Sequence, residues 1–134
     1  MSAIESIEGI GGGYGQALRG AGIKTVENLL EICCDRKTRE QISAKIGISE
    51  KLLLKWVNMA DLFRVRGVAS QYAELLECAG VDTVRELAQR RPDSLHAKMV
   101  TTNQAKRVVR QVPSLRIVES WISHAKSLPR KVTH

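Results

Sequence analysis

The sequence predicts an all-α protein, and three features of its 134 residues point to this class. Aromatic residues make up only 4% of the chain, which lacks the alternating runs of β-branched and aromatic residues that strands require. Apolar residues recur at helical spacing, as in Leu52, Trp56, Met59 and Phe63. Capping residues mark several helix starts, and the segments between helices are short. We therefore expect a compact bundle of helices.

Four helices are expected in the first half of the chain. Capping boxes stand at Ser2/Glu5 and at Thr38/Gln41, where the hydroxyl accepts from the third helical N–H and the later side chain reaches back. Gly22 follows an apolar helical pattern and is expected to end that helix in the left-handed conformation. The expected helices of this half cover 12–21, 25–34, 38–46 and 49–64.

Five more helices are expected in the second half. Gly80 repeats the role of a left-handed cap, and Thr83/Glu86 forms a third capping box. Pro92 and Pro113 stand where a first helical residue costs no hydrogen bond. The expected helices of this half cover 70–79, 83–91, 93–99, 103–111 and 114–127.

The chain contains an internal repeat. An offset of 58 positions superimposes like residues, namely Gly9 on Gly67, Tyr14 on Tyr72, Leu18 on Leu76, Ala21-Gly22 on Ala79-Gly80, Thr25-Val26 on Thr83-Val84 and Leu29 on Leu87. Towards the end of each copy the offset becomes 65, and Trp56 falls on Trp121, so we expect both tryptophans to be core anchors between the repeats. The two repeats, 1–61 and 62–134, are expected to pack as one body with pseudo-two-fold symmetry.

The net charge of +7 and the isoelectric point near 9.7 predict a surface that attracts phosphates, nucleic acid or acidic lipid. This charge is uneven, because residues 1–61 carry eight basic and eight acidic side chains, whereas residues 62–134 carry thirteen and six. Within the second half, the stretch 85–116 holds eight cations against Glu86 and Asp93 alone. An anion-binding surface is expected to use mainly this stretch.

Compartment and membrane signals are also informative. The N-terminus has no basic segment followed by an apolar one, and apolar runs are only a few residues long, so neither a signal peptide nor a membrane span is expected.

The cysteines Cys33, Cys34 and Cys78 are odd in number and lack zinc-site spacing. Cys33 and Cys34 could form a redox pair, but small buried thiols are favoured at the end of an apolar helix. A reduced, cytoplasmic location is expected.

Motifs of catalysis and cofactor binding are missing from the sequence. It contains neither G-x-x-x-x-G-K-[ST] nor G-x-G-x-x-G, which disfavours nucleotide hydrolysis and dinucleotide binding. His96, His124 and His134 lie far apart and are expected at the surface rather than as metal ligands. We therefore expect no enzymatic activity, no catalytic residue, no cofactor and no metal.

One motif suggests a function, and we call it the first glycine turn, residues 7–13. Ile10 stands between Gly9 and Gly11, and Gly12 and Gly13 lead into a helix. Glycines leave backbone N–H groups uncovered, and a helix N-terminus attracts a phosphate oxygen. The turn resembles the helix-hairpin-helix superfamily, in which such hairpins grip the sugar-phosphate backbone of DNA from the minor-groove side. The duplicated pattern is also similar to a largely bacterial family of unknown function, which implies a tandem helix-hairpin-helix fold but no activity.

The second glycine turn, residues 65–71, keeps Gly67 but replaces the second glycine with Ala69. Both turns lack the early Lys or Arg that many hairpins of the superfamily place in the second helix, so charge must come from elsewhere. The glycines could also serve only tight turns between helices. The predicted nucleic-acid-binding residues are Gly9, Ile10, Gly11, Gly12, Gly13, Arg64, Arg66, Gly67, Ser70, Lys106, Arg107 and Arg110.

Two functions are compatible with these features of the sequence. The first is sequence-independent binding of nucleic acid, with DNA favoured over RNA, through the glycine turns and the basic second half. The second is a protein-interaction or assembly module for an acidic partner, favoured by the missing lysines and the neutral first half. The sequence predicts no membrane partner and no particular oligomeric state.

Overall fold

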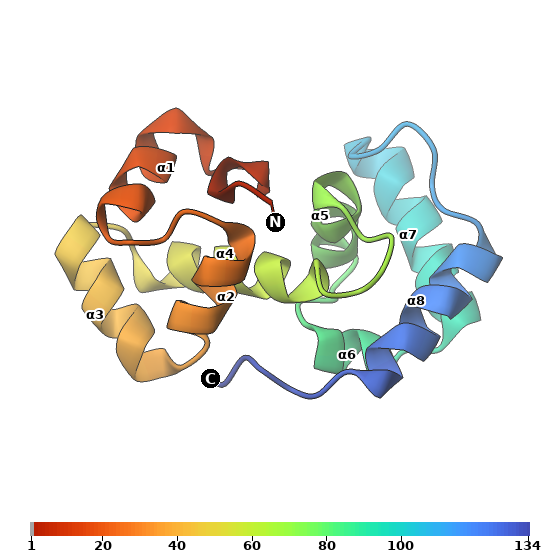
Figure 1. Cartoon of the computed structure of the whole chain (residues 1–134). Coiled ribbons are helices and arrows are strands. Elements are labelled where there is room, and N and C mark those ends of the chain that lie inside the picture. The colour runs from red at the N-terminus through yellow and green to blue at the C-terminus, as the bar shows by residue number, and fades with distance from the viewer. Residues whose placement is uncertain (1) are drawn as a thin grey trace. The chain divides into compact units, whose positions relative to one another are not determined.

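A computed structural model describes residues 2–134 and confirms the all-α class. Within this range the chain forms eight α-helices and a short 3-10 helix, η1 (Ile4–Ser6), and no β-strand. The α-helices are labelled in Figure 1. An isolated antiparallel bridge joins Ala3 and Thr25. No helix in the described range is long and apolar enough to cross a membrane.

The chain divides into two compact units. The first contains Met1–Asp61 together with Lys131–His134, and the second contains Leu62–Arg130. The chain therefore leaves the first unit near the end of α4 and returns to it in its last four residues. The sequence assigned those four residues to the second repeat and contains no sign of their return.

The first unit is built from four helices: α1 (Gly11–Gly20), α2 (Val26–Cys33), α3 (Arg36–Ile46) and most of α4 (Glu50–Leu62). The helix η1 packs on α1 and α2, and α2 packs on α3. Trp56 of α4 is buried, and the ring of Tyr14 meets it edge-on with centroids 5.1 Å apart. This aromatic pair belongs to the core of the first unit.

Two of the expected capping boxes are wrong. Ser2 does not cap η1; its amide donates to Glu27, and Glu5 instead pairs with Arg19. The start of α3 is capped by Asp35, whose carboxylate accepts from the Thr38 amide at 3.0 Å. This hydrogen bond holds the pKa of Asp35 below its usual range. A carboxylate is a strong N-cap, and its negative charge is stabilised by the positive end of the helix dipole. The helix therefore begins before Thr38.

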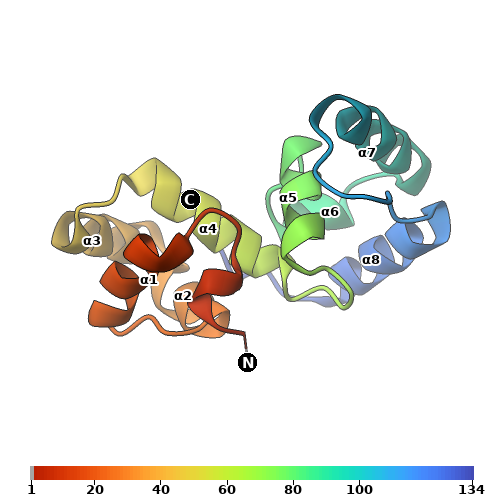
Figure 2. The same ribbon diagram turned by 90° about the horizontal axis from the view of Figure 1, so that it is seen from above.

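The second unit contains α5 (Ser70–Cys78), α6 (Val84–Ala88), α7 (Pro92–Lys106) and α8 (Leu115–Ser127). In both views α8 runs beside α6, and α7 also packs on α8 (Figures 1 and 2). Trp121 is buried, and its ring lies 5.5 Å from that of Tyr72. The ring of each tryptophan thus contacts the ring of a tyrosine of its own unit.

The expected helices 93–99 and 103–111 are wrong, because α7 is continuous from Pro92 to Lys106. Thr101 does not interrupt it, since its hydroxyl donates to the Ala97 carbonyl within the helix. Pro92 opens the helix as expected. Pro113 does not begin α8, because the hydroxyl of Ser114 caps that helix.

Local backbone geometry recurs at the offset of 58. Gly22 and Gly80 have φ of +89° and +93°, as expected for left-handed caps. The amides of Ile23 and Val81 each donate to the backbone carbonyl of the leucine five residues earlier, with an N···O distance of 2.9 Å. Thr25 and Thr83 both cap the following helix. The same residue types therefore produce the same turns in both units.

Candidate functional site

The first glycine turn is held by two buried isoleucines. Ile7 and Ile10 are almost fully buried, and the Ile10 amide donates to the Ile7 carbonyl at 3.3 Å. Gly9 between them has φ +92°, and Gly11 has φ +60°. Side chains other than glycine rarely adopt such angles, so the two glycines permit the tight entry into α1.

The outer side of this turn is bare backbone. Gly9, Gly11, Gly12 and Gly13 are exposed, and a Cβ atom added to any of them would meet nothing within 4 Å. No side chain caps α1. Among the described residues, nothing accepts from the amides of Glu8, Gly9, Gly11 and Gly12. These N–H groups, with the positive end of α1, suit an anionic oxygen.

The charge of Arg19 does not reinforce the first glycine turn. Arg19 is neutralised by Glu5, with its Nε and Nη2 donating to the two carboxylate oxygens at 2.9 and 2.7 Å. This ion pair lowers the pKa of Glu5 to about 2. Glu8, which is exposed, adds a negative charge within the turn itself. The amides of the first glycine turn therefore receive no support from Arg19.

The second glycine turn has a backbone similar to that of the first glycine turn, but side chains enclose it more. Val65 and Val68 are buried, and the Val68 amide donates to the Val65 carbonyl at 3.1 Å. Gly67 has φ +90°, and the indole nitrogen of Trp121 would lie 3.1 Å from an added Cβ. The positive φ and the close indole together favour a glycine at this position.

The replacement of the second glycine changes the entry into α5. Ala69 is extended, with φ −98°, where its counterpart Gly11 has φ +60°. Ser70 opens α5, but its hydroxyl oxygen is buried and has no hydrogen-bond partner in the described part of the chain. The Ser70 hydroxyl is thus placed inside the protein and not towards a surface ligand.

The two arginines around the second glycine turn differ in availability. Arg64 donates from Nη2 to the Pro129 carbonyl at 2.6 Å and is half-buried. Arg66 is exposed, but its backbone amide donates to Nδ1 of His124 at 3.0 Å. The second glycine turn therefore has a cation, while one of its amides is already occupied.

The remaining predicted cations form what we call the basic loop, residues 106–110. Lys106, Arg107 and Arg110 are exposed and make no ion pair within the described residues. Residues 94–118 contain no Asp or Glu at all. The positive charge of this loop is therefore uncompensated locally.

The backbone of the basic loop is held in one conformation by Asn103. Its side-chain amide donates to the Val109 carbonyl and accepts from the Val109 amide, both at 2.9 Å. The Arg107 amide donates to the Asn103 carbonyl at 2.8 Å, and Arg107 has φ +50°, the only positive value outside glycine in the described chain. Arg107 and Arg110 border one shallow depression. The basic loop therefore presents its cations from a backbone that hydrogen bonds hold in place.

The predicted site residues thus form three groups. The first glycine turn lies in the first unit, and the second glycine turn and the basic loop lie in the second unit. Sequence reasoning missed His124 and Asn103, because each acts through a partner whose proximity depends on the fold. The end of the helix near Asn103 contains no glycine, so the sequence carries no signal there that the helix stops.

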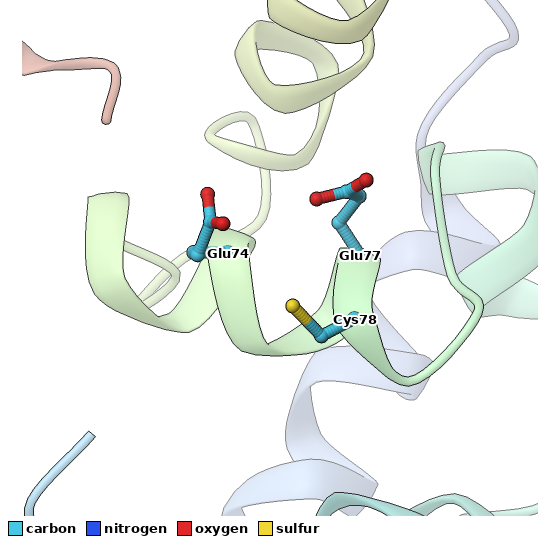
Figure 3. Close-up of side chains that lie close together, drawn as sticks. All are labelled: Glu74, Glu77 and Cys78. Atoms are coloured by element: carbon cyan, nitrogen blue, oxygen red, sulfur yellow. The ribbon is translucent and has the colours of Figure 1, made fainter. Parts of the chain in front are cut away.

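One further cluster lies on α5, where side chains of Glu74, Glu77 and Cys78 point to the same side of the helix (Figure 3). Their ligand atoms lie within 4.8 Å of one another. They come from one helical turn and number three among the described residues, whereas a structural zinc site closes a tetrahedron with four ligands. The expectation of no metal site rests on sequence spacing alone.

Fold and site together define an all-α protein of two units, each with a glycine turn, and with its net positive charge concentrated in the second unit. The chain belongs to the family described as a domain of unknown function, DUF4332, whose model matches residues 8–128. This confirms the expected membership of a family of unknown function. Neither the curated proteins nor the solved structures compared with the chain include a match.

Proposed function

We propose that this protein is a non-enzymatic, tandem helix-hairpin-helix protein that binds the backbone of nucleic acid without reading its sequence. DNA is the favoured target, because the superfamily that the glycine turns resemble grips the DNA backbone. Contacts to phosphates position a protein on a duplex and carry no direct sequence information. The cysteines of the described residues form no disulfide, which is in keeping with a reducing, cytoplasmic location.

The basic loop is the observation that carries this proposal. Lys106, Arg107 and Arg110 lie within five residues, are exposed, and have no carboxylate between residues 94 and 118 to neutralise them. Each cation that neutralises a phosphate releases a condensed counterion, which supplies affinity independent of sequence. Because Asn103 holds the loop, little conformational freedom is lost on binding.

The first glycine turn supports the proposal as a second contact. Its free amides and the N-terminus of α1 match the needs of a phosphate oxygen. Arg66 gives the second glycine turn the positive side chain that the first one lacks. In this proposal the first glycine turn contributes hydrogen bonds, and the second unit contributes charge.

The proposal is tested by fluorescence anisotropy of a labelled DNA duplex across a salt series. The double variant R107E/R110E should weaken binding by roughly tenfold or more and lower the slope of log affinity against log salt by about 2. K37E/K45E on exposed positions of α3 is the matched control with the same charge change. Absence of binding at low salt, or equal losses in both variants, would contradict the proposal.

The contribution of the first glycine turn is measured with Gly13→Glu and Gly13→Gln. An added side chain meets open space there, and both residues favour a helix more than glycine does. The carboxylate also suits the start of α1 but repels phosphate, so Gly13→Glu should weaken duplex binding more than Gly13→Gln. Equal affinity of the two variants would remove this turn from the interface.

A protein-docking function is the second candidate, and Glu8 is the observation that favours it. This exposed carboxylate lies in the first glycine turn, where it opposes a phosphate, and Glu5 neutralises the nearby Arg19. An acidic partner protein would then contact the basic loop. A pull-down that recovers such a partner after nuclease treatment would favour docking, whereas loss of the partner would favour nucleic acid.

A further inference from the structure

His124 connects the last turn of α8 to the second glycine turn. The ring is half-buried, and its Nδ1 accepts from the Arg66 backbone amide at 3.0 Å. A neutral imidazole can accept at Nδ1 only when its proton is on Nε2. A protonated imidazole has two donors and no acceptor, so this hydrogen bond exists only while His124 is neutral.

Protonation of His124 would change both the hydrogen-bond donors and the charge that the second glycine turn offers to a phosphate. The Arg66 amide would lose its acceptor and become free to donate to an anionic oxygen. The imidazolium would become a second donor beside it, with a positive charge. The exposed side chain of Arg66 already lies in the same turn. The second glycine turn would then combine a free amide with positive charge, a combination that the first one lacks.

Attraction between the imidazolium and an anion couples this proton to phosphate binding. Near this end of α8, Tyr72 contacts Trp121, Arg64 donates to the Pro129 carbonyl, and Arg85, Lys126 and Arg130 line a shallow depression. An imidazolium beside the free Arg66 amide would donate a charge-assisted hydrogen bond to an anionic oxygen. Proton uptake and phosphate binding should therefore strengthen each other.

We propose that His124 is a pH-sensitive gate of the second glycine turn, which opens this turn to a backbone phosphate when the ring is protonated. This inference rests on the proposed nucleic-acid function and adds its regulation. It assigns to His124 a role as a positioning residue for the Arg66 amide in the closed state. In the open state, the imidazolium itself contacts the phosphate.

Duplex binding at pH 7.5 and pH 5.5, at constant ionic strength, tests the gate with the full-length protein. Wild-type affinity should rise by roughly three- to tenfold at the lower pH, as expected for one charge-assisted phosphate contact. In His124→Asn, Oδ1 takes the place of Nδ1 and accepts at every pH. This variant should lose the gain at pH 5.5.

The controls His96→Asn and His134→Asn should keep the gain. The gate is overturned if His124→Asn keeps it as well, or if a duplex binds wild type with an affinity that does not change with pH. A second readout is independent of duplex binding. In nuclear magnetic resonance spectra, the Arg66 amide should shift together with the His124 ring as the pH falls, and inorganic phosphate should move both transitions to higher pH.

These readouts separate the two proposals. If no duplex binds at either pH while the Arg66 amide follows His124 and responds to inorganic phosphate, the nucleic-acid function fails and the gate stands. If a duplex binds but the Arg66 amide does not follow the His124 ring, the gate fails and the nucleic-acid function stands.

Discussion

Gly9 and Gly12 lie in the same exposed turn, and an added Cβ meets open space at both, yet only Gly9 has a positive φ. Gly9→Ala should therefore lower the free energy of unfolding by about 1–2 kcal/mol through backbone strain. Gly12→Ala should raise it by about 0.5–1 kcal/mol, because alanine loses less freedom in a helix. Urea denaturation measures both. Equal effects of the two substitutions would show that φ does not decide the need for glycine here.

The Glu5–Arg19 pair makes a pH-dependent prediction at the same scale. The pKa of Glu5 is lowered to about 2 in the folded protein from an ordinary value of 4.5, mainly by the hydrogen bond from Arg19. The pair therefore stabilises the fold fully above pH 4.5, and this contribution is lost as the pH falls towards 2. In Arg19→Gln, the pKa of Glu5 should move back towards 4.5. A side-chain carboxyl titration by nuclear magnetic resonance checks this, and an unchanged pKa would rule out the pairing.

The cysteines behave as the sequence predicts at one position. Cys33 is buried, and this burial raises the pKa of its thiol to about 11. A thiol of this kind is a weak nucleophile at neutral pH. Cys34 is half-buried, so the expectation of buried thiols at Cys33 and Cys34 is confirmed for Cys33 alone.

At the scale of elements, α7 and the basic loop show where sequence patterns end. The apolar residues of 93–111 follow no clear helical stripe, so the sequence does not show that one helix spans the gap between the expected helices 93–99 and 103–111. The end of α7 at Lys106 depends on Asn103, whose side chain replaces a backbone partner for Val109. A sequence shows that Asn favours such local bonds but does not show which one forms.

Asn103→Ala should loosen the basic loop. Both polar groups of the buried Val109 would lose their partner, at a cost of about 1–3 kcal/mol. Hydrogen exchange at the Val109 amide should accelerate, and duplex binding should weaken although no charge has changed. Gln104→Ala, an exposed neighbour on α7, is the control and should leave both measurements unchanged. Unaltered exchange in Asn103→Ala would show that other contacts hold the loop.

At the scale of the whole molecule, the C-terminal residues 131–134 complete the first unit. The Thr133 amide donates to the Cys34 carbonyl at 2.9 Å, and the buried Arg39 donates to the Thr133 carbonyl at 2.5 Å. Val132 is buried, and Lys131 pairs with Glu31 at 2.9 Å. Four residues separated from the first unit by some seventy others in sequence therefore belong to it.

Deletion of residues 131–134 should destabilise the first unit selectively. It removes the buried Val132 and leaves the buried Arg39 guanidinium without one acceptor, at a combined cost of about 3–5 kcal/mol. Hydrogen exchange should increase at amides of α2 and α3 and remain unchanged in α7 and α8. Lys131→Ala alone, which removes only an exposed ion pair, should have little effect. Equal exchange in the deleted and full-length proteins would contradict this role of the C-terminal residues.

The sequence by itself determined the helical class, the glycines that must turn the chain, and the recurrence of those turns at an offset of 58. These features are local, since backbone conformation and capping depend on residues a few positions apart. Only the tertiary structure decided that His124 occupies the Arg66 amide, that Asn103 holds the basic loop, and that residues 131–134 join the first unit. Two of these contacts join residues more than fifty positions apart, and the third selects one local hydrogen bond from several. Such choices depend on the packing of the whole chain.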